Sequence, residues 1–154
     1  MTATADDFLR QLRAGVTTAS AGETRALAAR LAPLLPPDQV LALHGDLGAG
    51  KTTFVQGLAR GLGIGAAVTS PTFNIFTIHR GGARMLVHLD AYRLENDRQI
   101  ESLMLEDFLE TPWCLAVEWP EKIAAWLPAG TWHLSLAIES AGRHHTRLAP
   151  KLEK

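Results

Sequence analysis

The stretch that decides the fold is Gly45-Asp46-Leu47-Gly48-Ala49-Gly50-Lys51-Thr52. Two glycines flank four residues and lead directly into Lys-Thr, which matches the pattern G-x-x-x-x-G-K-T in full. Glycines reach backbone angles that other residues resist, so consecutive N–H groups can turn inward around an anion. A helix that follows would add its positive N-terminal end. This stretch therefore predicts a loop that binds phosphate groups.

The segments on either side of the loop have the patterns that such a loop requires. Residues 40–44 form a short apolar run, typical of a strand that is covered on both faces. After the loop, Phe54, Leu58 and Leu62 recur at helical spacing. Strand, glycine loop and helix follow one another in the order that phosphate binding needs, which chance matches to the pattern rarely have.

Patterns elsewhere in the chain predict an α/β protein. Ser20 and Glu23 fit a capping box, in which each side chain satisfies a free backbone donor at a helix start. Two strand-like runs, residues 72–79 and 84–90, flank Gly81-Gly82 and predict a β-hairpin. The other expected elements are the remainder of the first helix up to residue 35, a helix at 96–109, a strand at 113–117, a short helix at 121–126, and antiparallel strands at 131–138 and 146–148.

The order of these elements predicts a P-loop NTPase-like three-layer fold with a mixed sheet. We expect an antiparallel portion to be inserted into a parallel core. No internal repeat, low-complexity linker or domain boundary interrupts the chain, so residues 1–154 are expected to form a single domain.

Composition excludes several classes of protein. With 15 basic and 16 acidic residues, the chain has no excess of positive charge for a large nucleic-acid-binding face. The single cysteine, Cys114, cannot form an intramolecular disulfide, and its apolar neighbours favour a buried, inert thiol. No run of 18 apolar residues predicts a membrane span, and the N-terminus lacks the pattern of a secretory signal. We therefore expect a cytoplasmic protein with no membrane contact.

Within the loop, each polar side chain has an expected role. Lys51 carries a charge that can reach the β- and γ-phosphates, and the Thr52 hydroxyl is placed to ligate Mg²⁺. Thr53 can touch the α-phosphate. Asp46 lies inside the loop, where a structural hydrogen bond is a better expectation than catalysis. These features predict a nucleoside triphosphate with Mg²⁺ as the ligand.

Two carboxylates complete the predicted site. Asp90 follows the apolar run at 85–89, and Glu118 follows the run at 114–117. The ends of strands in an open α/β sheet form the crevice in which ligands bind. Either acid could hold Mg²⁺ while the other orients the attacking water, and the sequence leaves this division open. The alternative for each acid alone is a cap on the next element.

Four groups of residues resemble one protein family. In chain order they are Gly45 to Thr53, Thr69-Ser70-Pro71-Thr72-Phe73, His88-Leu89-Asp90-Ala91-Tyr92-Arg93-Leu94, and Val117-Glu118-Trp119-Pro120-Glu121-Lys122. This ordered set resembles the TsaE (YjeE) family, the small bacterial ATPases of tRNA threonylcarbamoyladenosine biosynthesis. The resemblance covers about residues 20–125, and the ordered set is far more specific than the phosphate loop alone.

The resemblance implies ATP and Mg²⁺ as cofactors and the proteins TsaD and TsaB as partners. In that family, TsaD transfers threonylcarbamoyl from its adenylate to an adenosine beside the anticodon. The ATPase does not make this bond itself; it binds the TsaD–TsaB assembly, and its ATP hydrolysis supports repeated turnover. Contact with tRNA is then indirect, through the complex.

The resemblance also implies roles for individual residues. Lys51 binds phosphate, Thr52 and Glu118 hold Mg²⁺, and Asp90 is an essential acid of the site. Thr72 lies where P-loop proteins keep an element that senses the γ-phosphate. Trp119 packs near the nucleotide, with a place in the core as the open alternative. The full nucleotide-binding set implied is Asp46, Leu47, Gly48, Ala49, Gly50, Lys51, Thr52, Thr53, Thr72 and Trp119, with Lys51, Asp90 and Glu118 as catalytic residues.

Two other functions use the same loop. A small-molecule kinase needs an acceptor pocket and a mobile arginine-rich lid, and the later strands of this chain enclose no arginine-rich insertion. A nucleotide-dependent interaction module would bind ATP or ADP and hardly hydrolyse it. The sequence leaves both open as alternatives, and it does not determine selectivity between adenine and guanine or the oligomeric state.

Overall fold

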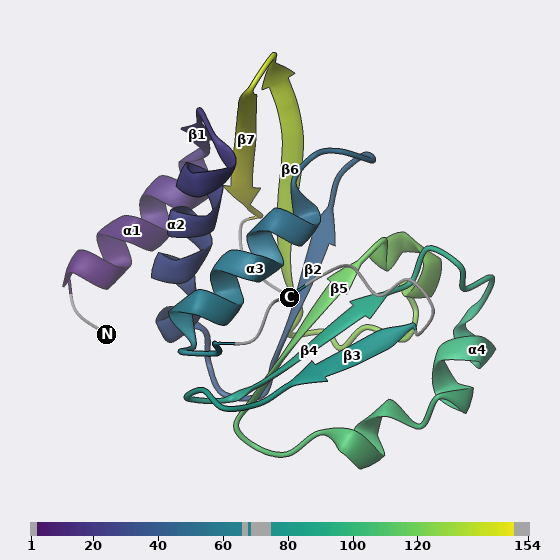
Figure 1. Cartoon of the computed structure of the whole chain (residues 1–154). Helices are drawn as coiled ribbons and strands as arrows, with labels where there is room; N and C mark the ends of the chain where they lie inside the picture. The colour runs from purple at the N-terminus through teal and green to yellow at the C-terminus, as the bar shows by residue number, and fades with distance from the viewer. Residues whose placement is uncertain (1–2, 66–67, 69–74, 150–154) are drawn as a thin grey trace.

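The computed structural model describes residues 3–65, 68 and 75–149. Its helices and strands alternate along most of the chain (Figure 1). In chain order they are α1 Ala3–Ala14, β1 Val16–Thr18, α2 Ala21–Leu31, η1 Ala32–Leu34, β2 Gln39–His44, α3 Lys51–Gly61, β3 Phe76–His79, β4 Met85–Asp90, α4 Asp97–Ser102, η2 Leu105–Phe108, β5 Trp113–Glu118, η3 Pro120–Ile123, β6 Trp132–Ser140 and β7 Arg143–Leu148, where η marks a 3-10 helix.

The strands form one mixed sheet in the order β1-β7-β6-β2-β5-β4-β3. β6, β2, β5 and β4 run parallel to their neighbours among themselves, and the antiparallel pairs lie outside them: β3 on β4 at one edge, β7 on β6 and β1 on β7 at the other. The mixed sheet is as predicted. The expectation that the antiparallel portion is inserted into the parallel core is wrong, because both hairpins extend the sheet outward from its parallel centre.

Helices cover both faces of the sheet, which makes the three layers expected from the sequence (Figure 1). Leu41 and Leu43 of β2 pack on the face covered by α1, α2 and α3, while Val40 packs on the face covered by α4, η2 and η3. Successive residues of a strand point to opposite faces, so a central strand between two helical layers is largely apolar. This explains the apolar runs of β2 and β5, and that of β4, which His88 interrupts.

Several predicted elements are confirmed in detail. The Ser20 hydroxyl accepts the Glu23 N–H at 3.1 Å and caps α2 as predicted. The Glu23 carboxylate accepts the N–H of Ala19 at 3.0 Å and not that of Ser20, so the second bond of the expected capping box is displaced by one residue. The hairpin around Gly81-Gly82 pairs β3 with β4. Cys114 is fully buried in β5, and this burial raises the pKa of its thiol to about 12, as expected for an inert cysteine.

The predicted helix at 96–109 is wrong in its second half. α4 ends at Ser102, and Met104 adopts a left-handed conformation with φ of 51°, which breaks the helical period before η2 begins. Met104 and Phe108, expected on the buried face, are 60% and 45% exposed, whereas Ile100 is buried. Tertiary packing thus overrides a helical pattern that the spacing of apolar residues alone favours.

Other differences are smaller. The helix expected at 121–126 is the single 3-10 turn η3, and α1 and β1 occupy an N-terminal region for which no element was predicted. Of the strand expected at 72–79, the structure describes β3, and residues 72–74 lie outside the described residues. Within the described ranges, every helix is too short or too polar to span a bilayer.

Candidate functional site

The glycine loop connects the end of β2 to the start of α3 and needs glycine at two positions for different reasons. A Cβ atom on Gly45 would lie 2.5 Å from the carbonyl oxygen of Leu136 on β6, so a larger residue would displace that strand. Gly50 caps α3 in a left-handed conformation with φ of 102°, which residues with a side chain rarely adopt. Between them, the Ala49 N–H donates to the Asp46 carbonyl at 3.0 Å. This turn bond uses the backbone of Asp46, so the structural role expected for its side chain stays a prediction.

The hairpin of β6 and β7 supports this loop from the side. The carbonyl of Ala49 accepts a hydrogen bond from Nδ1 of His144 at 3.0 Å, although 95 residues separate them. His145 points the other way, towards Gly15. The two histidines therefore face opposite sides of β7, as expected from strand geometry. The support that His144 gives to the loop was not predicted, because no local pattern reports such a distant contact.

His44, the last residue of β2, pairs with β6 rather than with the loop. Its Nε2 lies 2.7 Å from Nδ1 of His133. Burial, followed by the proximity of His133, lowers the pKa of His44. His44 is thus held against β6 by its contact with His133.

Lys51 begins α3 and is held at the mouth of the loop by neutral partners. Its side chain is 5% exposed; the ammonium donates to the Gly45 carbonyl at 2.6 Å and lies 3.4 Å from the centre of the Trp119 ring. Burial lowers the pKa of Lys51, and Glu118 is the largest opposing influence. The Lys51 ammonium therefore lies beside the loop, and it forms no ion pair with an acidic side chain of the described residues.

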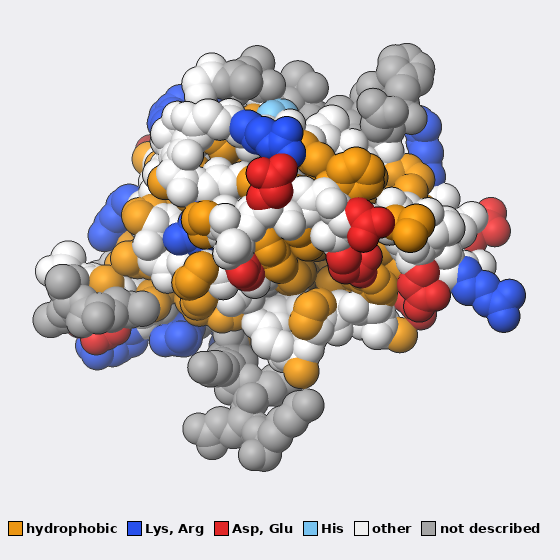
Figure 2. Space-filling view, turned by 90° about the horizontal axis from the view of Figure 1, so that it is seen from below, with side chains coloured by type: hydrophobic (Ala, Val, Ile, Leu, Met, Phe, Trp, Pro, Cys, Tyr) orange, Lys and Arg blue, Asp and Glu red, His pale blue; other side chains and the backbone are white. Residues whose placement is uncertain are grey.

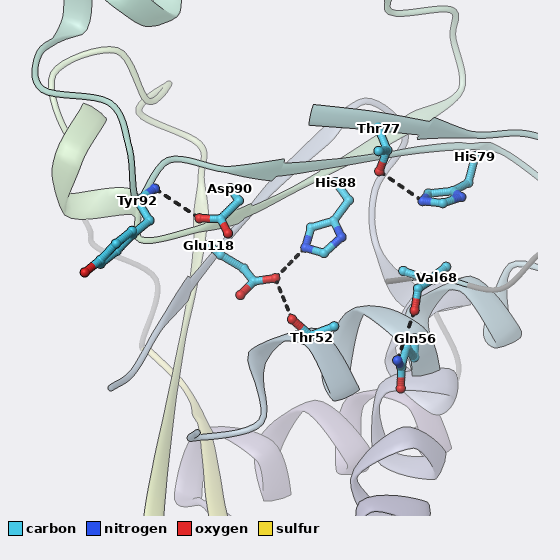
Figure 3. A network of polar contacts seen from close by, with 9 residues as sticks. All are labelled: Thr52, Gln56, Val68, Thr77, His79, His88, Asp90, Tyr92 and Glu118. Carbon is cyan, nitrogen blue, oxygen red and sulfur yellow. Dashed lines mark hydrogen bonds and ion pairs between the residues drawn. The ribbon is translucent and has the colours of Figure 1, made fainter. Parts of the chain in front are cut away.

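Thr52, the next residue, reaches the carboxylate that ends β5. Its hydroxyl donates to Oε2 of Glu118 at 3.1 Å, and the same oxygen is hydrogen-bonded to Nε2 of His88 on β4 (Figure 3). Both Glu118 and His88 are buried. The predicted pairing of Thr52 with Glu118 is therefore present as a contact. His88 was not assigned a role from the sequence, and the one available signal was a polar residue that interrupts the apolar run at 85–89.

Asp90 ends β4 directly beside the end of β5. The parallel register places Asp90 opposite Glu118, so the two acids lie at the same edge of the sheet, as predicted. The carboxylate of Asp90 also accepts the Tyr92 N–H at 3.0 Å (Figure 3), which closes a turn directly after β4. The expected alternative of a cap on the next element does not apply, because Asn96 caps α4, and the role of Asp90 as an acid of the site stays a prediction.

Trp119 directly follows Glu118 and lies between the ends of β4 and β5 and the glycine loop. It adopts a left-handed conformation with φ of 57°, and its ring packs on that of Tyr92 with centroids 5.1 Å apart. Its contact with the Lys51 ammonium places the ring at the mouth of the loop, while its other side contacts the core under η3. Trp119 therefore packs against the core as the alternative expected, and its predicted contact with the nucleotide stays a prediction.

The structure describes most of the remaining residues of the predicted site. Leu47 is 86% exposed at the tip of the loop, and Thr53 lies half-buried in the first turn of α3. Arg93 is exposed after the end of β4. Thr72 lies outside the described residues, so its predicted role stays a prediction.

The oxygens of Thr52 and Glu118 suit a magnesium ion. Adjacent ligands of an octahedral Mg²⁺ at about 2.0–2.1 Å from the ion lie about 2.9 Å from each other. The 3.1 Å between Thr52 Oγ1 and Glu118 Oε2 is close to that spacing. Across the described part of the chain, no group of three or more His, Cys, Asp or Glu side chains could enclose a metal. The donor set thus fits a hard cation that takes its other ligands from water and phosphate.

Comparison with known proteins identifies the family of the chain. A family model described as "Threonylcarbamoyl adenosine biosynthesis protein TsaE" matches residues 18–148. The chain is 42% identical over 125 residues to the tRNA threonylcarbamoyladenosine biosynthesis protein TsaE of Bacillus subtilis, covering 81% of this chain and 77% of that protein. It is 35% identical to the protein of the same name from Treponema pallidum, covering 84% and 96%. The crystal structure of Bacillus subtilis YdiB superposes with a TM-score of 0.72 and 34% identity, covering 88% of this chain and 84% of that one.

Proposed function

The chain belongs to the TsaE family, whose role lies in tRNA threonylcarbamoyladenosine biosynthesis, and from this we propose that it is a Mg²⁺-dependent ATPase supporting that modification. The observation that carries the proposal is the contact between Thr52 of the loop and Glu118 at the end of β5. It brings a loop of phosphate-binding pattern next to a buried carboxylate, which is the combination that metal-assisted phosphoryl transfer requires.

In this proposal the loop binds the phosphates through backbone N–H groups that its glycines turn inward and through the N-terminal end of α3. Lys51 exchanges the Gly45 carbonyl and the Trp119 ring for phosphate oxygens. Such an exchange is favourable because hydrogen bonds between ionised partners are stronger than those to neutral ones. Trp119 then remains beside the nucleotide.

The two acids divide the remaining work. Glu118 already contacts Thr52, so these two residues would hold Mg²⁺, which offsets the charge of the phosphates when it is bound. Asp90 lies opposite Glu118 at the same edge of the sheet, so we assign it to orienting the attacking water. Thr72 keeps its proposed role in sensing the γ-phosphate.

We further propose that the chain acts on the TsaD–TsaB complex in the cytoplasm and contacts tRNA only through it. The near-zero net charge supports this arrangement, because a principal grip on tRNA would require an excess of basic residues. On the face shown in Figure 2, acidic and basic side chains of the described residues are interspersed among apolar ones, and they form no extended basic surface there. Hydrolysis would promote repeated turnover of the complex.

Reconstitution of the chain with TsaD, TsaB, ATP, Mg²⁺ and tRNA tests the proposal. We expect phosphate release to rise when TsaD and TsaB are added, and modified adenosine to accumulate over many turnovers only with this chain present. Binding of ATP without any rise in phosphate release would instead favour a passive nucleotide-binding module. Phosphorylation of a nucleoside or sugar acceptor would favour the kinase.

A further inference from the structure

His88 is a buried polar residue in an otherwise apolar stretch of β4. Its side chain is completely buried, and so are Val87 and Leu89 on either side. Leu86, two residues earlier on the same face of the strand, shows that an apolar side chain fits this environment. Burying an imidazole in place of such a residue is unfavourable unless its polar atoms are hydrogen-bonded. The position of His88 therefore calls for a contact that compensates this burial.

Glu118 supplies that contact. Nε2 of His88 is hydrogen-bonded to Oε2 of Glu118 (Figure 3). An ionised carboxylate can only accept, so Nε2 carries the proton and donates it. The other ring nitrogen, Nδ1, is buried and has no hydrogen-bond partner among the described residues. Within that part of the chain, the hydrogen bonding of His88 is thus directed to Glu118 alone.

The same carboxylate oxygen also accepts the Thr52 hydroxyl at 3.1 Å. Two donors on one oxygen, from β4 and from α3, determine the direction in which that oxygen points. A hydroxyl has two lone pairs besides its proton, so the Thr52 oxygen can turn a lone pair to a cation, and the bond from His88 to Glu118 does not depend on that change. His88 then holds Oε2 in place while the metal binds between Thr52 and Glu118.

We propose that His88 is a positioning residue that orients the Glu118 carboxylate towards a Mg²⁺ ion shared with Thr52. The proposal rests on the proposed function, because it needs the Mg²⁺–nucleotide complex. Residues that hold a metal ligand by a hydrogen bond change metal affinity by about 10- to 100-fold when they are lost. A residue that only fills space in β4 would have no such effect on the metal.

A matched pair of variants separates the two roles. His88→Gln keeps an N–H donor at the end of a side chain of similar length, and His88→Met has nearly the same shape without the donor. His79 on β3 provides a control, since it is half-buried nearby and bonds to Thr77 at 3.2 Å instead of to Glu118 (Figure 3). His79→Met removes a histidine without touching the metal ligands.

The measurement is calorimetric binding of ADP to the full chain at increasing Mg²⁺ concentrations, beginning without Mg²⁺. We expect His88→Met to bind ADP alone as the unmodified chain does and to need about 10- to 100-fold more Mg²⁺ for half of the Mg²⁺-dependent gain in affinity. His88→Gln should recover most of this loss, and His79→Met should match the unmodified chain. Unchanged Mg²⁺ dependence in His88→Met, or an equal loss in His88→Gln, would overturn the proposal.

A second measurement does not depend on how the variants fold. In the unmodified chain, ¹⁵N NMR of the histidine rings should show the His88 signals shifting when Mg²⁺ is added to the ADP complex, with those of His79 nearly unchanged. If the His88 signals do not shift when Mg²⁺ is added, the positioning role is contradicted. Failure of the unmodified chain to bind ADP at any Mg²⁺ concentration would instead refute the proposed function, so the two failures are distinguishable.

Discussion

The candidate site has two sides that are built in different ways. The loop side, residues 45–52, is one continuous segment whose geometry follows from glycines and a helix start. The strand-end side consists of His88, Asp90, Glu118 and Trp119, which come from two strands and the turn after one of them. On the loop side, left-handed backbone positions are filled by glycine, whereas Trp119 on the strand-end side adopts φ of 57° with a full side chain.

This difference indicates a division of labour. A segment with glycines at its bends can surround phosphate with little strain, so binding needs only local sequence. Backbone strain that persists in a residue with a large side chain is typical of functional sites, where surrounding contacts hold it in place. The contacts of the Trp119 ring with Tyr92 and Lys51 are of this kind. The proposed function thus assigns binding mainly to the loop side and hydrolysis to the strand-end side.

Loss of Lys51 should have the largest effect and tests the loop side. We expect Lys51→Ala to weaken ATP binding by about 100-fold or more, because truncating one partner of a buried charge pair costs about 2–5 kcal/mol. Calorimetric titration with ATP and Mg²⁺ measures this. Lys122→Ala serves as the control, since Lys122 is exposed and lies outside the loop. Unchanged affinity in Lys51→Ala would refute the phosphate-binding role of the loop.

Loss of Glu118 should affect the strand-end side of the site and leave the loop side intact. Glu118→Ala is expected to bind ATP without Mg²⁺ about as well as the unmodified chain, and to lose hydrolysis by about 100-fold, because the metal loses its carboxylate ligand. Calorimetric titration with ATP in the absence of Mg²⁺ measures the expected binding. Phosphate release with TsaD and TsaB present measures the expected loss of hydrolysis. If Glu118→Ala hydrolyses ATP normally, the metal-holding acid is Asp90 and the assignment of the two carboxylates must be reversed.

Loss of His144 should have a smaller effect on the loop side. The hydrogen bond from His144 to Ala49 is the support that the β6–β7 hairpin gives to the loop. Since one such bond contributes about 1 kcal/mol, we expect His144→Ala to weaken ATP binding by about fivefold with little change in the rate of hydrolysis at saturating ATP. His145→Ala, on the opposite face of β7, is the comparison. Equal losses in both variants would point to general loosening of the hairpin.

The smallest expected effect concerns the backbone conformation of Met104, which lies outside the candidate site. Met104 shares the left-handed conformation of Trp119 but is 60% exposed. Glycine adopts this conformation without a steric penalty, so Met104→Gly should raise stability to unfolding by about 1 kcal/mol and leave nucleotide binding unchanged. Denaturant unfolding measures the change. A loss of stability would show that the Met104 side chain contributes packing that outweighs the strain.

Much of the fold could be predicted because its signals are local. The helix cap at Ser20, the hairpin around Gly81-Gly82 and the apolar runs of β2 and β5 each depend on residues within a few positions of one another. The helix expected at 96–109 failed where a local pattern competed with tertiary packing. At Met104 the chain turns out of the helix, although the apolar spacing continues through Phe108.

The sequence alone determined that residues 45–52 form a phosphate-binding type of loop between a strand and a helix, and that acids follow two buried strands. Backbone preferences of glycine and the side-chain period of helices and strands act over a few residues, so they can be read directly. Only the tertiary structure decided which acid meets the loop. The contacts of Thr52 with Glu118, of Glu118 with His88 and of Ala49 with His144 join residues 66, 30 and 95 positions apart. They depend on the order and register of strands in the sheet, which no local pattern encodes.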